Sequence, residues 1–175
     1  MTPDTTKQRI AHWVRQSPLL WAVLQIAYRA TQPRFTLGVL GVVFSPVGRI
    51  LVVEHVYHPK TPWGFPGGWL GRREHPHEGV IREVREETSL SITIINPILV
   101  MISPYHRRHL DTAFLCRAET ETVHLSEELL DHRWLPPAEA LNVPMTIFHK
   151  ASLRAALAAA PTAAPTTEET THLSP

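Results

Sequence analysis

Cysteine is almost absent from this sequence, since Cys116 is the only one among 175 residues. A single cysteine excludes an intramolecular disulfide and any zinc site built from several cysteines. Cys116 ends the apolar run Ala-Phe-Leu-Cys. We therefore expect its thiol to be buried and to pack as a small hydrophobic group.

Net charge and long apolar runs are also lacking. The 17 lysines and arginines balance 16 acidic residues to a net charge of +1, which argues against bulk nucleic-acid binding. The most apolar stretch, Pro18 to Tyr28, has eleven residues, too few to cross a bilayer. The residues that follow it make a poor signal-peptide cleavage site. We expect a cytoplasmic protein.

The rest of the composition is that of an ordinary globular domain. Hydrophobic residues make up 43% and charged residues 19%, and the length suits one domain. We divide the chain into an N-terminal helical extension, a main domain and a disordered tail rich in Pro, Thr and Ala. These parts cover residues 1–34, 35–160 and 161–175.

The N-terminal extension has a helical pattern of apolar residues from about residue 8 to residue 30. Three interpretations stay open. The helix packs on its own domain, lies on a membrane surface through its tryptophans, or forms a homodimer. We expect the first, with membrane contact and a homodimer as the alternatives.

The main domain alternates strand and helix patterns. The β-rich runs 35–45 and 49–56 flank a Pro-Val-Gly turn, which is a hairpin signature. Further strands are predicted at 91–102 (one bent or two short), 110–118 and 132–135, and helices at 138–141 and 147–160. This order predicts an α+β domain with a mixed β-sheet between helices.

Residues 61–68 form a loop in which prolines and glycines disfavour regular structure. Gly67 and Gly68 allow the backbone to approach a phosphate or a metal ion closely. The aromatic residues Trp63, Phe65 and Trp69 suit core packing as well as ligand contact.

A short acidic helix follows this loop. Pro76 suits the first helical position, where its missing N–H costs nothing. Val80, Ile81 and Val84 form an apolar stripe that we expect to dock the helix on the core.

Three carboxylates on this helix predict a metal site. Glu83, Glu86 and Glu87 stand at i, i+3 and i+4 and therefore share one face. Arg82 can pair with Glu86 one turn on, but one cation does not neutralise three carboxylates. Hard oxygen ligands without thiolates favour Mg²⁺, or Mn²⁺, over zinc.

The stretch from Gly68 to Leu90 resembles the signature of the Nudix hydrolases. Five residues separate Gly68 from Glu74, and seven separate Glu74 from Arg82, as in that family's box. The further matches are Glu83, Val84, Glu86, Glu87 and Leu90. Ser89 replaces the family's glycine. We expect it in the left-handed region at a cost of about 1 kcal/mol.

The resemblance implies a Nudix α/β/α sandwich and an Mg²⁺-dependent pyrophosphohydrolase acting on a nucleoside diphosphate derivative. It implies that Glu83, Glu86 and Glu87 bind the metal, that Arg82 holds the glutamates in place and that Glu74 supports the loop. The general base varies within the family. Glu86 is our first candidate, and Glu128, in the loop before Trp134, is the second.

Substrate contacts are less well defined. Gly67 and Gly68 are candidates for the phosphate-binding loop. The basic residues near the site are candidates for phosphate contacts, although a solvated basic loop explains them equally well: Arg72, Arg73, His106, Arg107, Arg108 and His109. Two alternatives to the enzyme prediction remain, a nucleotide-binding regulatory module without turnover and an RNA 5′-end pyrophosphohydrolase.

Overall fold

The computed structural model describes residues 5–57 and 59–160. Contacts within the chain divide it into two compact units, residues 1–35 and 36–175. The predicted disordered tail, residues 161–175, lies outside the described residues.

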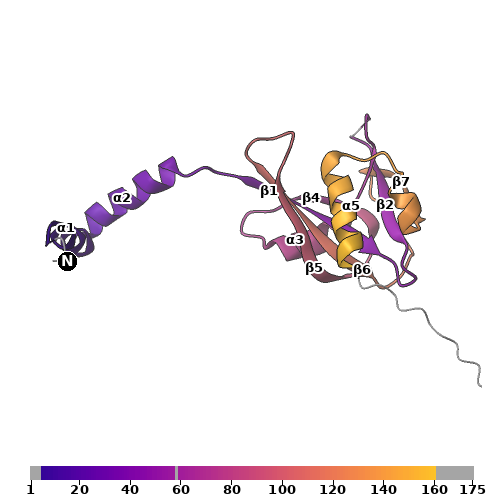
Figure 1. The fold of residues 1–175 in the computed structure, drawn as a ribbon, viewed down its shortest axis with the longest axis horizontal. Helices are drawn as coiled ribbons and strands as arrows, with labels where there is room; N and C mark the ends of the chain where they lie inside the picture. The colour runs from indigo at the N-terminus through magenta and orange to yellow at the C-terminus, as the bar shows by residue number, and fades with distance from the viewer. Residues whose placement is uncertain (1–4, 58, 161–175) are drawn as a thin grey trace, which may run out of the picture. The chain divides into compact units, whose positions relative to one another are not determined.

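The N-terminal unit contains two helices, α1 (Thr5–Gln16) and α2 (Pro18–Thr31), drawn in indigo and violet in Figure 1. The prediction of a single helix here is wrong. Ser17 caps α2, accepting a hydrogen bond of 3.3 Å from the Leu20 N–H, and Pro18 occupies the first turn of α2. A proline that lacks its N–H starts a helix more readily than it continues one.

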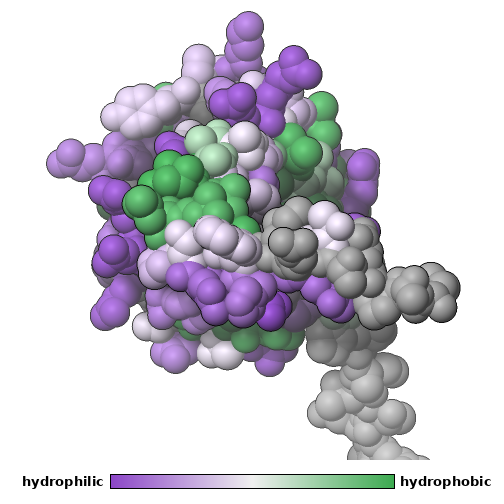
Figure 2. Space-filling model, turned by 90° about the vertical axis from the view of Figure 1, so that its left-hand side faces the viewer, coloured by the Kyte–Doolittle hydropathy of each residue, from purple (hydrophilic) through white to green (hydrophobic). Residues whose placement is uncertain are grey.

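Apolar side chains are exposed in the N-terminal unit. No residue of α2 is buried, and the exposed ones include Leu19, Trp21 and Ile26. The space-filling view shows green apolar side chains gathered beside a purple hydrophilic band (Figure 2). Among the described helices, none combines the length and the apolarity that crossing a bilayer requires.

The main unit is built on a mixed seven-stranded sheet. Its strands are β1 (Thr36–Phe44), β2 (Ile50–His55), β3 (Trp63–Gly64), β4 (Gly67–Trp69), β5 (Ile92–Ile102), β6 (His109–Ala118) and β7 (Leu129–Leu135). They lie in the order β3-β2-β1-β6-β5, with β4 paired to β1 and β7 paired to β2. β1 runs parallel to β6 and antiparallel to β2 and β4, so the predicted mixed sheet is confirmed.

Three strand predictions need comment. β5 is one strand with register shifts on either side of Asn96-Pro97, which confirms the bent strand. β7 begins three residues earlier than expected, because Leu129 still pairs with His55 beyond a bulge at Leu130 of β7. The loop 61–68 contains β3 and the start of β4, so the expectation of no regular structure there was wrong.

Helices cover both faces of the sheet. Alternate residues of a strand point to opposite faces. Leu40 and Val42 of β1 join a core with Phe148 of α5 (Ile147–Ala159), whereas Val39 and Val43 join a second core with Val84 of α3 (Pro76–Thr88). The short helix α4 (Pro137–Ala140) contributes to the α5 side. This is the predicted α/β/α arrangement (Figure 1).

The acidic helix α3 begins at Pro76 as predicted, and the Glu78 carboxylate accepts a hydrogen bond of 3.3 Å from the His75 N–H. Its apolar stripe is narrower than predicted. Val80 and Val84 are fully buried, but Ile81 is 39% exposed. At 100° per residue Ile81 turns away from Val80, and only the i, i+4 pair faces the sheet.

Cys116 is buried in the core on the α3 side, as predicted. Burial raises the pKa of its thiol to about 12, so it remains neutral and unreactive.

Ser89 caps α3 in the left-handed region, with φ 60° and ψ 12°. Replacing it with glycine is expected to raise the free energy of unfolding by about 0.5–1 kcal/mol, because glycine has no Cβ to strain. The measurement is the midpoint of thermal unfolding. Ser91→Gly is the control, since Ser91 does not have a positive φ, and it should lower the midpoint. Equal shifts in both variants would contradict the account.

Candidate active site

Two glycines bring β4 close to its neighbours. A Cβ on Gly67 would lie 2.2 Å from the Val39 carbonyl oxygen of β1, and one on Gly68 would lie 2.6 Å from the Glu83 carboxylate. Only glycine allows this approach. The glutamates of α3 therefore lie directly against the backbone of β4.

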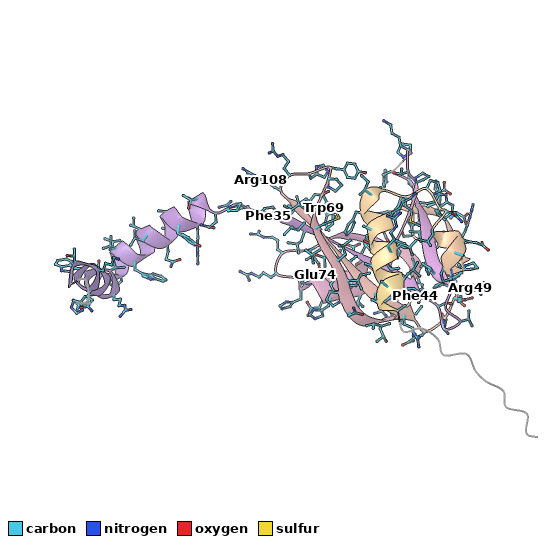
Figure 3. All side chains as sticks on the ribbon, in the orientation of Figure 1. Phe35, Phe44, Arg49, Trp69, Glu74 and Arg108 are labelled. Carbon is cyan, nitrogen blue, oxygen red and sulfur yellow. The ribbon has the colours of Figure 1, made fainter. Side chains whose placement is uncertain are left out.

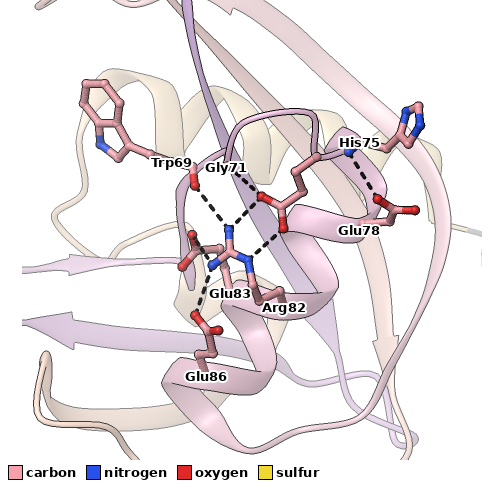
Figure 4. Close-up of polar contacts among 8 residues, drawn as sticks. Trp69, Gly71, His75, Glu78, Arg82, Glu83 and Glu86 are labelled. Atoms are coloured by element: carbon pink, nitrogen blue, oxygen red, sulfur yellow. Dashed lines mark hydrogen bonds and ion pairs between the residues drawn. The ribbon is translucent and has the colours of Figure 1, made fainter.

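Arg82 is the centre of the acidic cluster (Figure 4). Its Nε lies 2.7 Å and its Nη2 3.0 Å from the two Glu74 carboxylate oxygens. Its Nη1 lies 2.9 Å from Glu83 and 3.0 Å from Glu86, and its Nη2 donates to the Trp69 carbonyl at 3.2 Å. The predicted pair with Glu86 is present, and Arg82 binds two further carboxylates that its helical spacing to Glu86 did not predict.

Glu74 and Arg82 anchor the loop between β4 and α3. Glu74 also accepts a hydrogen bond of 2.7 Å from the Gly71 N–H. The hydrogen bonds from Arg82, and then that from Gly71, lower the pKa of Glu74 to about 2. The pKa of Arg82 is raised above its ordinary value, chiefly by its hydrogen bonds to Glu74. The two side chains therefore form a fixed ion pair at neutral pH.

The three glutamates of α3 differ in burial more than their shared helical face suggested. Glu86 is exposed, the Glu83 side chain is 14% exposed, and Glu87 is only 6% exposed. The Glu87 carboxylate accepts a hydrogen bond of 2.9 Å from the Gly67 N–H. It thus points inward beneath the glycines of β4.

Burial raises the pKa of both inner carboxyls. For Glu83 the raised pKa results from burial and is partly offset by Arg82. For Glu87 burial raises the pKa to about 8, against the opposing effect of the Gly67 N–H, and the charges of Glu83, Glu128 and Glu86 add to the rise. The cluster is therefore short of positive charge even with Arg82 in place.

The donor set suits a hard divalent cation. It consists of carboxylate oxygens with no thiolate near them, and its inner members lack sufficient counter-charge. Within residues 5–57 and 59–160, no three His, Cys, Asp or Glu side chains already converge as a metal-binding group. Since Glu86 is 60% exposed, its carboxylate can turn without disturbing the core.

A pocket of about 270 Å³ lies beside this cluster. Its wall is formed by β1, β4, β6 and α5, with Glu87 and Glu128 among the lining residues. Glu128 is exposed, and its charge reaches Glu87 closely enough to raise the pKa of Glu87. The pocket therefore adjoins the acidic cluster through Glu87.

The structure brings most of the predicted site residues together. Gly67, Gly68, Glu87 and Glu128 line the pocket, and Glu74, Arg82, Glu83 and Glu86 form the cluster next to it. Arg73 and Arg107 are exposed and do not line the pocket. Their assignment to the substrate stays a prediction.

Several pocket residues were not predicted as site residues. Asp111 and His149 had no sequence signal, because only strand register and helix packing bring them to the pocket. His55, at the end of β2, is partly buried and lines the pocket. His109, grouped with the basic turn, is 6% exposed and hydrogen-bonded within the wall.

Gly68→Ala is expected to displace the Glu83 carboxylate, because the new Cβ would lie 2.6 Å from its atoms. The end of a flexible side chain can move, so the protein should fold while any turnover falls by roughly 10²-fold. Steady-state rates and thermal unfolding test this. Adding Glu83→Asp in the same background shortens the acid and should restore part of the rate. A fully active Gly68→Ala variant would contradict this geometry.

Comparison with known proteins identifies the family of the chain. Residues 34–156 match the family model described as NUDIX domain. The chain is 28% identical over 116 residues to Nudix hydrolase 5 of Arabidopsis thaliana, which covers 62% of this chain and 38% of that protein. It is 30% identical over 107 residues to a MutT-like protein of Streptomyces ambofaciens, covering 61% and 68%. The chain thus spans little more than a third of the plant protein's length.

Solved structures share the fold. A NUDIX hydrolase from Nitrosomonas europaea superposes with a TM-score of 0.63 at 18% identity, covering 70% of each chain. The NUDIX domain of Shewanella oneidensis NrtR, solved in complex with ADP ribose, superposes with a TM-score of 0.60 at 21% identity, covering 74% of this chain and 90% of that one.

Proposed function

The chain belongs to the Nudix family, and we propose that it is an Mg²⁺-dependent hydrolase of a pyrophosphate linkage in a nucleoside diphosphate derivative. The observation that carries the proposal is the cluster in which Arg82 binds Glu74, Glu83 and Glu86 beside a pocket lined by Glu87. The ADP ribose held by the NrtR domain supports the ligand class.

Glu83, Glu86 and Glu87 are the residues that would hold Mg²⁺, with Mn²⁺ as a substitute. When bound, the ion neutralises phosphate oxygens and lowers the pKa of a water molecule. The glycines of β4 leave room for the phosphates to approach the strand backbone closely. The pocket next to Glu87 then receives the rest of the substrate.

Arg82 acts as a positioning residue. Its guanidinium holds Glu83 and Glu86 about one hydrogen-bond length away, and Glu74 fixes the guanidinium from the loop side. Glu86, the exposed member, is our candidate to accept the proton of the attacking water. Glu128, at the pocket wall beside Glu87, is the second candidate for that role.

A phosphate-release screen tests the proposed activity. The full chain is incubated with Mg²⁺ and a panel of nucleotide derivatives, and a phosphatase is added to expose new phosphomonoesters. The panel contains nucleoside triphosphates, ADP ribose, nucleotide sugars, NADH, dinucleoside polyphosphates and a 5′-triphosphorylated RNA. Release that requires Mg²⁺ and disappears in Glu86→Gln supports the proposal. No release, with nucleotides still raising the unfolding temperature, would instead indicate a binding module.

A further inference from the structure

Three neighbouring strands place an aromatic ring and a carboxylate on one wall of the pocket. Gly38 of β1 pairs with Trp69 of β4 on one side and with Asp111 of β6 on the other. Paired residues of adjacent strands point to the same face of a sheet. Because Gly38 has no side chain, an open strip remains above it, between the indole of Trp69 and the carboxylate of Asp111. All three residues line the pocket.

The open strip is maintained by the residues around it. A Cβ on Gly38 would lie 2.8 Å from Nε2 of His109 and 3.1 Å from Oδ1 of Asp111. The first distance is shorter than real Cβ atoms show, so any other residue here would displace one of these polar groups.

His109 holds both flanking groups in place. Its Nδ1 is 2.7 Å from the Thr36 hydroxyl, and its Nε2 is 3.1 Å from Oδ1 of Asp111. With a ring nitrogen engaged on each side, the imidazole is fixed. The Trp69 ring lies on it, with ring centroids 4.6 Å apart.

Trp69 and Asp111 each keep one side available to a ligand. Trp69, labelled in Figure 3, is 60% exposed although its ring contacts that of His109. Its side chain points away from Glu83 and Glu86 (Figure 4). Within the described part of the chain, Oδ2 of Asp111 has no hydrogen-bond donor, while Oδ1 is held by His109. The pair thus offers a flat stacking surface next to a fixed acceptor.

We infer that this wall selects a nucleobase that presents adjacent N–H donors, guanine above all, by stacking it on Trp69 and accepting its N–H groups at Asp111. An ionised carboxylate only accepts hydrogen bonds, so it can bind the imino N–H and the amino group of guanine. A base with a carbonyl at that position would be repelled, because two acceptors would face each other. The inference rests on the proposed function, because it assigns the base of that same substrate.

Nucleoside 5′-monophosphates test the inference without turnover, since they contain no pyrophosphate linkage. Binding of GMP, IMP, XMP, AMP and UMP to the full chain is measured by isothermal titration calorimetry. GMP is expected to bind at least about tenfold more tightly than IMP, which lacks the amino group, and than XMP, which places a carbonyl there. Equal binding of all five monophosphates by the wild-type chain overturns the inference, and this result requires no variant.

Two substitutions separate the two roles. Asp111→Asn replaces one acceptor with a donor, so it should weaken GMP binding about tenfold or more and strengthen XMP binding. Trp69→Ala should weaken the binding of all purine monophosphates by a similar factor of about 10–100-fold, and Trp69→Phe should retain much of the wild-type affinity. Asp131→Asn is the matched control, because the Asp131 side chain is 50% exposed and does not line the pocket, and it should leave the affinities unchanged. If a folded Asp111→Asn variant binds the five monophosphates in the same order of affinity as the wild type, Asp111 does not select the base and the inference is overturned.

The same preparations separate this inference from the proposed function. If phosphate release depends on Mg²⁺ but the monophosphates bind without base preference, the proposed hydrolase activity stands and only the base assignment is wrong. If the monophosphates bind with the expected base preference but no phosphate is released with Mg²⁺, the proposed hydrolase activity is wrong and the base assignment stands.

Discussion

Glu86→Gln is expected to lower turnover by about 10²–10⁴-fold with almost no loss of stability. Its carboxylate combines two proposed roles, as a metal ligand and as the acceptor of the water's proton, and glutamine performs neither well. The side chain is 60% exposed and belongs to no core, so the free energy of unfolding should change by no more than about 0.5 kcal/mol. Single-turnover rates and thermal unfolding of the same preparation measure both effects.

Glu128→Gln is the partner experiment that decides the general base. If Glu86 accepts the proton, Glu128→Gln should retain at least about a tenth of the wild-type rate. A larger loss of turnover in Glu128→Gln than in Glu86→Gln would mean that Glu128 is the general base. Wild-type rates in Glu86→Gln would contradict the proposed mechanism.

Arg82→Gln is expected to damage both stability and turnover. It removes the cation that binds Glu74, Glu83 and Glu86 together, and it leaves the buried Glu83 without its counter-charge. Because the Arg82 side chain is 34% exposed, solvent reduces the loss of stability to about 1–3 kcal/mol. Misplaced glutamates should lower turnover by roughly 10²-fold.

Arg85→Gln is the matched control, because Arg85 is exposed on the same helix and is not part of the cluster. It should leave the rate near that of the wild type and change stability by about 0.5 kcal/mol at most. Equal effects of the two substitutions would mean that helix charge, rather than the Arg82 contacts, supports the site.

The sequence was sufficient for features that depend on local spacing. The start of α3 at Pro76 and the pairing of Arg82 with Glu86 follow from positions within two helical turns. The left-handed cap at Ser89 was implied by the resemblance, because Ser89 stands at the glycine position of the family's box. The mixed sheet between helices followed from the order of strand and helix patterns.

The features that could not be predicted depend on tertiary packing. Spacing placed Glu83, Glu86 and Glu87 on one face, but only the approach of β4 buries Glu87 under Gly67 and leaves Glu86 in solvent. Similarly, Trp69 and Asp111 lie 42 positions apart in the sequence (111 − 69) and meet because both strands pair with β1 at Gly38. No local pattern specifies such a register.

The most direct test of the central claim is hydrolysis of the substrate panel in H₂¹⁸O, with Mg²⁺ or with EDTA, followed by mass spectrometry of the products. The proposal requires one ¹⁸O atom in a newly formed phosphate group, because water attacks phosphorus, and it requires that this product be absent with EDTA and in Glu86→Gln. Label in a product other than a phosphate, or labelled phosphate formed equally in EDTA, would contradict the proposal that the glutamate cluster of α3 catalyses Mg²⁺-dependent cleavage of a pyrophosphate linkage.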